Sequence, residues 1–212
     1  MAIAKSKELH DRLQSQQNKS SFDKSTRDKF TMADSVAKQM IDGSGHNLDD
    51  ERERYFAYKL DNKAVGLIFI TAKSDNLGEL YIDYITSHPG VRGAATALLE
   101  AALEESGKEP NVTLFSVHGS LAVYRKLGFK PQNEEMFTSE NLEEYDKMFL
   151  GLSYIGVDNL NRERKKVYDN YKQMRLQPHL SDLWELNGDS WHYKPDGDKY
   201  LADFMETDLS DE

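Results

Sequence analysis

A run of small residues, Gly90-Val91-Arg92-Gly93-Ala94-Ala95-Thr96, follows Pro89 and opens a helix pattern that continues to Glu105. The first N–H groups of an α-helix have no partner inside the helix, and the helix dipole places positive charge there. Small side chains also let an anion approach the backbone closely. The stretch therefore predicts a cradle for a diphosphate, although a turn that merely packs closely can show the same pattern.

A second motif stands further along the chain, in Leu121-Ala122-Val123-Tyr124-Arg125-Lys126-Leu127-Gly128-Phe129. The order strand, proline, cradle, helix, strand and a helix ending Tyr-x-x-Leu-Gly-Phe resembles the GNAT superfamily of acyl-CoA-dependent N-acetyltransferases. The superfamily cradle reads Gln/Arg-x-x-Gly-x-Gly/Ala, and Gly93 and Ala95 match its last two defined positions. Gly90 stands where Gln or Arg is expected, which removes one side-chain contact to the cofactor. The resemblance covers roughly residues 51 to 152.

The resemblance implies that acetyl-CoA, as co-substrate, lies where the parallel strands Glu79–Thr86 and Val112–Val117 splay apart. A strand N–H near Ile85 to Ser87 would polarise the thioester carbonyl, and an amine would attack it directly. Tyr124 matches the family tyrosine that gives a proton to the departing thiolate, a role that suits a phenol with a reference pKa of about 10. The alternative for Tyr124 is a core tyrosine. The residues expected to bind the cofactor are Ile85, Thr86, Ser87, Val91, Arg92, Gly93, Ala94, Ala95, Thr96 and Ser120.

Two carboxylates are candidates for the base that takes the proton of the amine. Glu79 lies fourteen positions before Gly93 and resembles the strand glutamate of the histone-acetylating branch. Asp83 shares a strand face with Glu79 if no bulge intervenes, because side chains alternate along a strand. Either residue can instead be a surface acid or an ion-pair partner, and many family members use only a water relay.

Histidines end two of the predicted strands. His88 and His118 flank the predicted cleft; a contact to substrate or a proton relay is one interpretation of His118, and a loop histidine in water is the alternative for it. The six histidines show no spacing typical of metal ligands, and the chain has no cysteine, so we predict no metal site and no thiolate nucleophile.

The elements that must position these residues predict a mixed α/β fold. We expect a GNAT-like, largely antiparallel sheet with splayed parallel strands and flanking helices, plus a C-terminal helical extension. We expect residues 1–50 to form a polar arm and a helix marked by Phe30, Ala33 and Ala37, residues 51–152 the acetyltransferase core, and residues 153–212 the extension. Within the core, β-rich runs on either side of Asp61-Asn62-Lys63 predict a hairpin. The first 24 residues predict a frayed arm or a short polar helix, and Glu144–Leu152 a strand or a helix. The helical stripe expected over residues 158–177 comprises Leu160, Val167, Tyr168, Tyr171 and Met174.

The charge and composition of the chain limit the kinds of partner and the location that we expect. The 212 residues carry a formal charge of -10, and the segment from Ser181 to Glu212 holds ten acids and two lysines. We expect no nucleic-acid partner, no membrane span, no secretory signal and a cytoplasmic location. The aromatic residues of that acidic segment predict packing onto the core, onto a second copy of the chain in a homodimer, or onto a partner; they are Trp184, Trp191, Tyr193, Tyr200 and Phe204. The alternative is a solvated tail with a few packed aromatics.

Two functions follow from this sequence. The first is acetyl transfer from acetyl-CoA to an amine on a small molecule or a protein, with Tyr124 as the acid. The alternative is a catalytically weak or inactive GNAT-fold protein that binds or regulates through its acidic, aromatic C-terminal segment.

Overall fold

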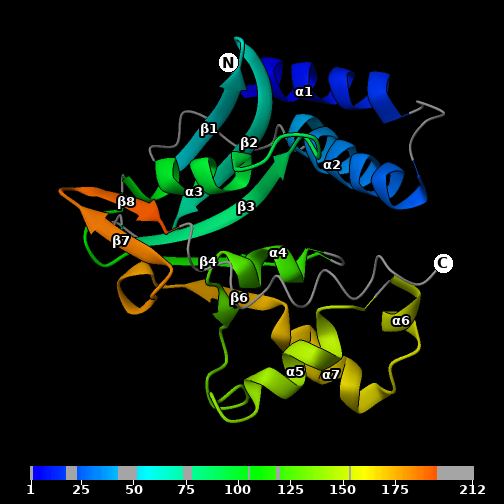
Figure 1. The fold of residues 1–212 in the computed structure, drawn as a ribbon, viewed down its shortest axis with the longest axis vertical. Helices are drawn as coiled ribbons and strands as arrows, with labels where there is room; N and C mark the ends of the chain where they lie inside the picture. The colour runs from blue at the N-terminus through cyan, green and yellow to red at the C-terminus, as the bar shows by residue number, and fades with distance from the viewer. Residues whose placement is uncertain are drawn as a thin grey trace. The chain divides into compact units, whose positions relative to one another are not determined.

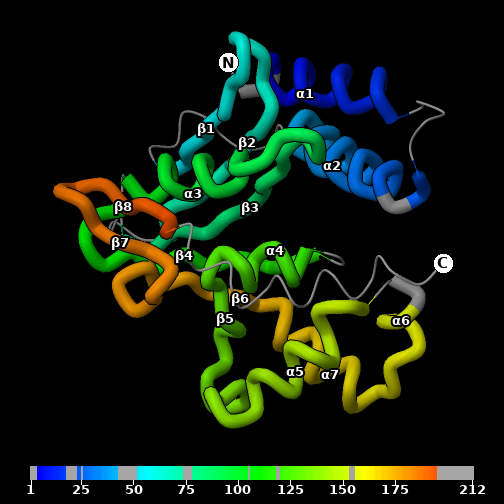
Figure 2. The backbone as a smooth tube through the Cα atoms, viewed as in Figure 1, coloured from blue at the N-terminus to red at the C-terminus, as the bar shows by residue number. Residues whose placement is uncertain are grey.

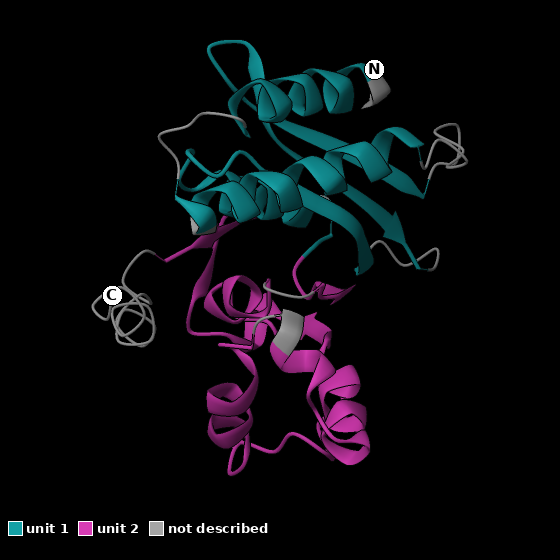
Figure 3. Cartoon of the chain, turned by 90° about the vertical axis from the view of Figure 1, so that its right-hand side faces the viewer, with its two compact units in different colours: residues 1–107 teal, residues 108–212 magenta. Residues whose placement is uncertain are grey.

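The computed structural model describes residues 2–17, 23–42, 52–73, 78–104, 106–117, 120–152 and 154–194. The chain forms two compact units, residues 1–107 and residues 108–212 (Figure 3). Each unit combines helices with antiparallel strand pairs. The predicted mixed α/β fold with largely antiparallel pairing is therefore confirmed.

The first unit opens with two helices, α1 (Ala2–Gln17) and α2 (Lys24–Asp42), which pack against each other (Figure 1). The helix predicted from Phe30, Ala33 and Ala37 is α2, and these three side chains are buried. Of the two expectations for the first 24 residues, the helix is correct. Helix α1 buries Leu9 and Leu13 in one core cluster with those residues of α2.

Three strands follow in the order β1-β2-β3, namely β1 (Glu53–Leu60), β2 (Lys63–Ala72) and β3 (Glu79–Ser87). The predicted hairpin joins β1 and β2, and its turn residues Asp61 and Asn62 have φ of 50° and 61°. Two central residues with positive φ are typical of the turn that fits the right-handed twist of paired strands.

Helices cover both faces of these strands. Leu67 of β2 packs in the cluster of α1 and α2, whereas neighbouring Gly66 faces α3 (Ala94–Glu104). A Cβ placed on Gly66 would lie 3.0 Å from a methyl carbon of Leu98, so glycine allows α3 to approach β2 closely. Alternation along β2 thus fixes α3, and the turn that precedes it, against one face.

The second unit contains the strands β4 (Asn111–Phe115), β6 (Gln173–Leu176) and β5 (Lys130–Pro131), in that spatial order, and a separate hairpin of β7 (Trp184–Asn187) and β8 (Ser190–Tyr193) (Figure 2). Its helices are α4 (Leu121–Lys126), α5 (Leu142–Phe149), α6 (Tyr154–Asp158) and α7 (Arg162–Tyr171), with a 3₁₀ turn η1 (Pro178–Leu180).

The predicted C-terminal extension differs from expectation in its strands. Helices α6 and α7 are present, but the helical stripe ends at Tyr171, and Met174 lies in strand β6, which pairs with β4 and β5. Sheet pairing overrides the helical period over these few residues. The sequence did not indicate this strand, because four residues are too few to show a strand period. The alternative for Glu144–Leu152 resolves as helix α5.

Candidate active site

The predicted cradle lies at the N-terminus of α3. The first intrahelical bond runs from the N–H of Ala97 to the carbonyl oxygen of Gly93 at 2.9 Å. The N–H groups of residues 93–96 therefore come before the repeating i to i−4 hydrogen bonds of the helix. Gly93 has a φ of 77°, a left-handed conformation that favours glycine, and a Cβ there would meet nothing within 4 Å. Close packing therefore does not explain Gly93, although the buried Ala94 does pack against Gly66.

The loop before α3 uses two of its own N–H groups. Val91 donates its N–H to the carbonyl oxygen of His88 at 2.9 Å, and Gly90 donates to Nδ1 of the His88 ring at 3.2 Å. The N–H of Val91, predicted to belong to the cradle, is therefore engaged within the loop. Arg92 and Gly93 are exposed, and Ala95 and Thr96 are partly buried.

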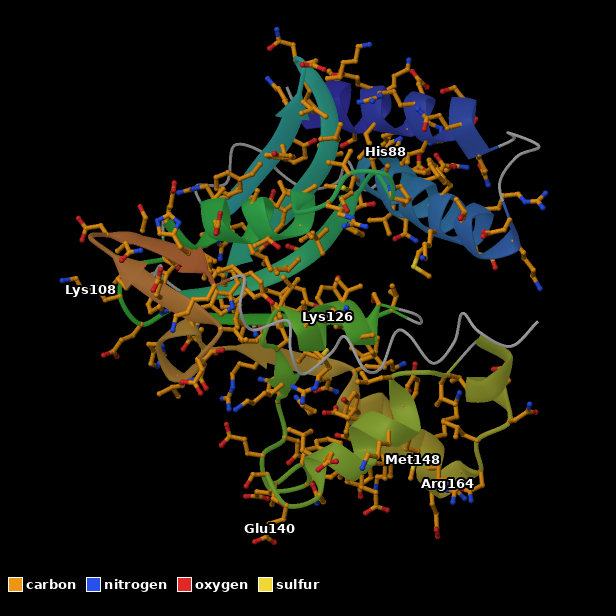
Figure 4. The ribbon with its side chains drawn as sticks, in the orientation of Figure 1. His88, Lys108, Lys126, Glu140, Met148 and Arg164 are labelled. Carbon is orange, nitrogen blue, oxygen red and sulfur yellow. The ribbon has the colours of Figure 1, made fainter. Side chains whose placement is uncertain are left out.

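His88 holds this loop to the N-terminal helices. Its side chain is 7% exposed, its Nε2 lies 2.9 Å from Oε1 of Gln16 in α1, and its ring packs edge-on against Phe30 of α2. Because Nδ1 accepts from Gly90, the ring proton belongs on Nε2, which donates to Gln16. Burial, with the nearby charge of Arg12, lowers the pKa of His88 below 6.5. His88 is thus buried between this loop and the two N-terminal helices, where Figure 4 labels it. His118 lies outside the described residues.

Strand β3 presents backbone donors on the edge that faces away from β2. His88 donates its N–H to the carbonyl oxygen of Val65 at 2.8 Å, and Ser87 and Ile85 pair with Gly66 and Ile68. In an antiparallel ladder this register directs the N–H of Thr86 to β2 and those of Ile85 and Ser87 to the other edge. The hydroxyl of Thr86 is not available to a ligand, because it is buried and donates to the carbonyl oxygen of Ala33 at 3.2 Å.

Both candidate bases lie on β3: Glu79 stands before a β-bulge, and Asp83 stands at it. The register with β2 shifts between Tyr84 and Ile82, which leaves Asp83 as the extra residue. Thr71 donates its hydroxyl to Oδ2 of Asp83 at 2.7 Å, so the carboxylate turns toward the face of Thr71. Tyr81, the register partner of Thr71, shares this face with Glu79, so the predicted common face of Glu79 and Asp83 persists. Glu79 is exposed at the start of the strand.

Tyr124 belongs to the second unit, on α4. Its ring packs edge-on against Phe129 at a centroid distance of 5.6 Å, and its hydroxyl interacts with that of Ser120. Ser120 in turn lies 3.0 Å, oxygen to oxygen, from the buried Ser116 at the end of β4. Burial raises the pKa of Tyr124 to about 12, and the hydrogen bond with Ser120 opposes part of this increase. The phenol is therefore protonated throughout the neutral range.

Comparison with known proteins identifies the family. The model of the acetyltransferase (GNAT) family matches residues 13–129, more than half of the chain. This chain belongs to the GNAT acetyltransferase family. It is also similar to the crystal structure of Tetrahymena GCN5, with 11% sequence identity, coverage of 81% of this chain and 85% of that chain, and a TM-score of 0.41. No curated protein matches the sequence.

The first unit of this GNAT protein suits the diphosphate of acetyl-CoA, the acyl donor that the family generally uses. The left-handed Gly93 turns the chain into α3, with open space at the position of its missing Cβ. The helix N-terminus offers backbone donors, and Arg92 adds an exposed cation. Gly90 contributes no side chain, but its N–H binds His88 and so orders the loop.

Each unit of the GNAT chain brings together some of the predicted site residues. Residues Ile85–Ser87, Glu79, Asp83 and the cradle lie in the first unit, and Tyr124 and Ser120 in the second. Among the described residues, no group of three acidic or histidine side chains is placed to hold a metal ion. No helix in the described ranges is both long and apolar enough to cross a membrane.

No sequence pattern indicated the partners that fix these residues in place. Gln16 precedes His88 by 72 positions, and no local pattern links them. The bidentate pair of Arg125 and Asp146, with N–O distances of 2.9 and 2.7 Å, joins α4 to α5, and Tyr171 donates its hydroxyl to the same carboxylate. Arg125 and its neighbour Lys126 are the two charges of this otherwise apolar motif, and no sequence pattern indicates which of them has a buried partner.

Proposed function

We propose that this GNAT protein transfers an acetyl group from acetyl-CoA to a primary amine by direct attack, with Tyr124 as the general acid. The N–H groups at the start of α3, with Arg92, would hold the diphosphate. The observation that carries the proposal is the turn at Gly93, because it combines an open left-handed glycine with a helix N-terminus within the residues that match the family.

In the proposed reaction the amine nitrogen forms a bond to the thioester carbon, and the carbon–sulfur bond breaks. The N–H groups of Ile85 and Ser87 are the candidates for stabilising the carbonyl oxygen, since the strand register directs both away from β2. Tyr124 gives its proton to the departing thiolate, and its pKa of about 12 keeps that proton in place until the sulfur acquires charge.

The proton of the amine passes to Glu79, to Asp83 or to a water molecule. Glu79 is exposed, whereas Asp83 already accepts a hydrogen bond from Thr71. We rank Glu79 first because its carboxylate stands at the solvent-accessible start of β3. After each turnover the phenolate of Tyr124 recovers a proton from solvent through the partly exposed hydroxyl of Ser120.

The acceptor is an amine on a small molecule or a protein. Two experiments test the proposal: calorimetric titration with CoA, and thiol release from acetyl-CoA with a panel of polyamines, aminoglycosides, lysine peptides and peptides with free N-termini. We expect micromolar binding and release that depends on one amine class. Binding without release for any amine would favour the alternative of a regulatory GNAT-fold protein, and no binding would refute acetyl transfer.

A further inference from the structure

The β7–β8 hairpin, Trp184 to Tyr193, contains both tryptophans of the chain. Trp184 and Trp191 are 3% and 4% exposed, and the rings of Trp184 and Tyr193 pack edge-on at 5.4 Å. Lys194 closes the base of the hairpin by donating its N–H to the carbonyl oxygen of Leu183 at 2.8 Å. The hairpin is therefore a packed element of the second unit and not a solvated tail.

Two side chains of this hairpin reach the C-terminal end of α4. Trp184 donates its indole N–H to the carbonyl oxygen of Leu127 at 2.8 Å. Tyr193 donates its hydroxyl to the carbonyl oxygen of Lys126, the last residue of the helix, at 2.9 Å. Figure 4 labels Lys126 on α4. Both bonds lie within the second unit.

These contacts supply partners that the helix itself cannot provide. The last carbonyl groups of an α-helix have no partner inside the helix. In α4, the oxygens of Val123, Tyr124 and Arg125 accept from Leu127, Phe129 and Gly128. Those of Lys126 and Leu127 accept from Tyr193 and Trp184. The carbonyl groups at the end of α4 therefore accept hydrogen bonds partly from the backbone that follows and partly from the hairpin.

The connection after α4 is also fitted to the segment that leads into β7. Gly128 has a φ of 89°, and a Cβ there would lie 3.1 Å from the hydroxyl oxygen of Ser181. Both the positive φ and the close approach of Ser181 favour glycine at this position, so the connection after α4 is fixed in this conformation. A short helix held at its end in this way has little freedom to rotate about its axis.

We infer that the β7–β8 hairpin is a positioning element for the general acid, with Tyr193 and Trp184 as the positioning residues. Tyr124 lies on α4 less than one helical turn from Lys126. Its hydroxyl must meet a sulfur atom within hydrogen-bond reach, and small displacements of a catalytic group lower rates steeply. The C-terminal segment thus acquires a role in turnover. This inference rests on the role proposed for Tyr124.

The decisive experiment is a double-mutant cycle of Tyr193→Phe and Tyr124→Phe. Tyr193→Phe keeps the ring and removes only the hydroxyl that binds Lys126. We expect kcat for thiol release to fall about 3- to 10-fold and KM for acetyl-CoA to change less than about 2-fold. In the Tyr124→Phe background, Tyr193→Phe should have no further effect on kcat, because there is no acid left to position. Trp184→Phe should behave as Tyr193→Phe does.

A spectroscopic measurement gives a second readout that does not depend on turnover. With ¹³Cζ-labelled tyrosine, the resonance of Tyr124 is the one that disappears in Tyr124→Phe. We expect it to move in Tyr193→Phe and to stay in Asp189→Asn, a matched change in the exposed turn of the hairpin. Tryptophan fluorescence reports the packing of the hairpin in each variant.

The outcomes separate the inference from the function on which it rests. If Tyr124→Phe retains full turnover, the proposed acid is wrong. If Tyr124→Phe loses turnover while Tyr193→Phe and Trp184→Phe keep theirs, or if the effects add in the cycle, the positioning role is overturned. An unmoved Tyr124 resonance in a Tyr193→Phe variant with native fluorescence would also overturn it.

Discussion

Acidification should weaken acetyl-CoA binding through His88. At neutral pH its Nδ1 accepts the N–H of Gly90, and this bond orders the loop that leads into the cradle. Protonation converts Nδ1 into a donor, so the bond is lost. One neutral hydrogen bond contributes about 1 kcal/mol, which corresponds to at most roughly fivefold in the dissociation constant, because CoA must then order a loop that the bond no longer holds.

The direction of the pH effect follows from the lowered pKa of His88. The folded protein binds this proton less readily than the unfolded chain, whose histidine has a pKa of about 6.5. Stability from His88 is therefore fully present above about pH 6.5 and declines as the pH falls toward the lower pKa of the folded state. The charged group that contributes is Arg12, which further disfavours protonation.

Matched variants separate His88 from the phosphates of CoA, which also titrate near pH 6. His88→Asn places an amide oxygen near the position of Nδ1, and His88→Phe keeps an aromatic ring but no acceptor. By calorimetry with CoA at pH 7.5, we expect His88→Asn to bind within about 2-fold of wild type and His88→Phe about 5-fold more weakly. Between pH 7.5 and 5.5, wild type should lose affinity more steeply than either variant. Equal pH profiles for wild type and His88→Phe would refute this reasoning.

Two further variants test the scaffold. Gly93→Ala should destabilise the protein by about 1 kcal/mol and weaken CoA binding, because alanine is strained at a φ of 77° although its Cβ has room; chemical denaturation and calorimetry measure the two effects, and unchanged values for both would contradict the assigned turn. Asp146→Ala should cost about 3 kcal/mol, because it leaves the guanidinium of Arg125, whose side chain is 14% exposed, without its carboxylate partner; a shift in the denaturation midpoint no larger than that of Glu143→Ala, an exposed acid of the same helix, would contradict this.

The elements that carry the site were predictable from local patterns. The β1–β2 hairpin was indicated by β-rich runs around Asp61 and Asn62, and α3 by the helix pattern that follows Gly93. Turn and helix patterns such as these depend only on residues close in sequence, so they can be recognised without knowledge of the tertiary structure.

The contacts that hold the site in place were not predictable in this way. The bond between His88 and Gln16, the short strand β6 and the hairpin bonds to α4 join segments that are distant in sequence. Each of these contacts depends on tertiary packing, which produces no recognisable periodic pattern in the sequence. Tyr200, Phe204 and most of the acids of the C-terminal segment lie outside the described residues, so the predicted partners of that segment stay predictions.

The most direct test of the proposed acetyl transfer compares Tyr124→Phe with wild type in thiol release and in CoA binding. We expect kcat to fall about 100-fold or more, because a general acid is lost, while the dissociation constant for CoA changes less than about 2-fold. Turnover equal to that of wild type would contradict the assignment of Tyr124 as the proton donor.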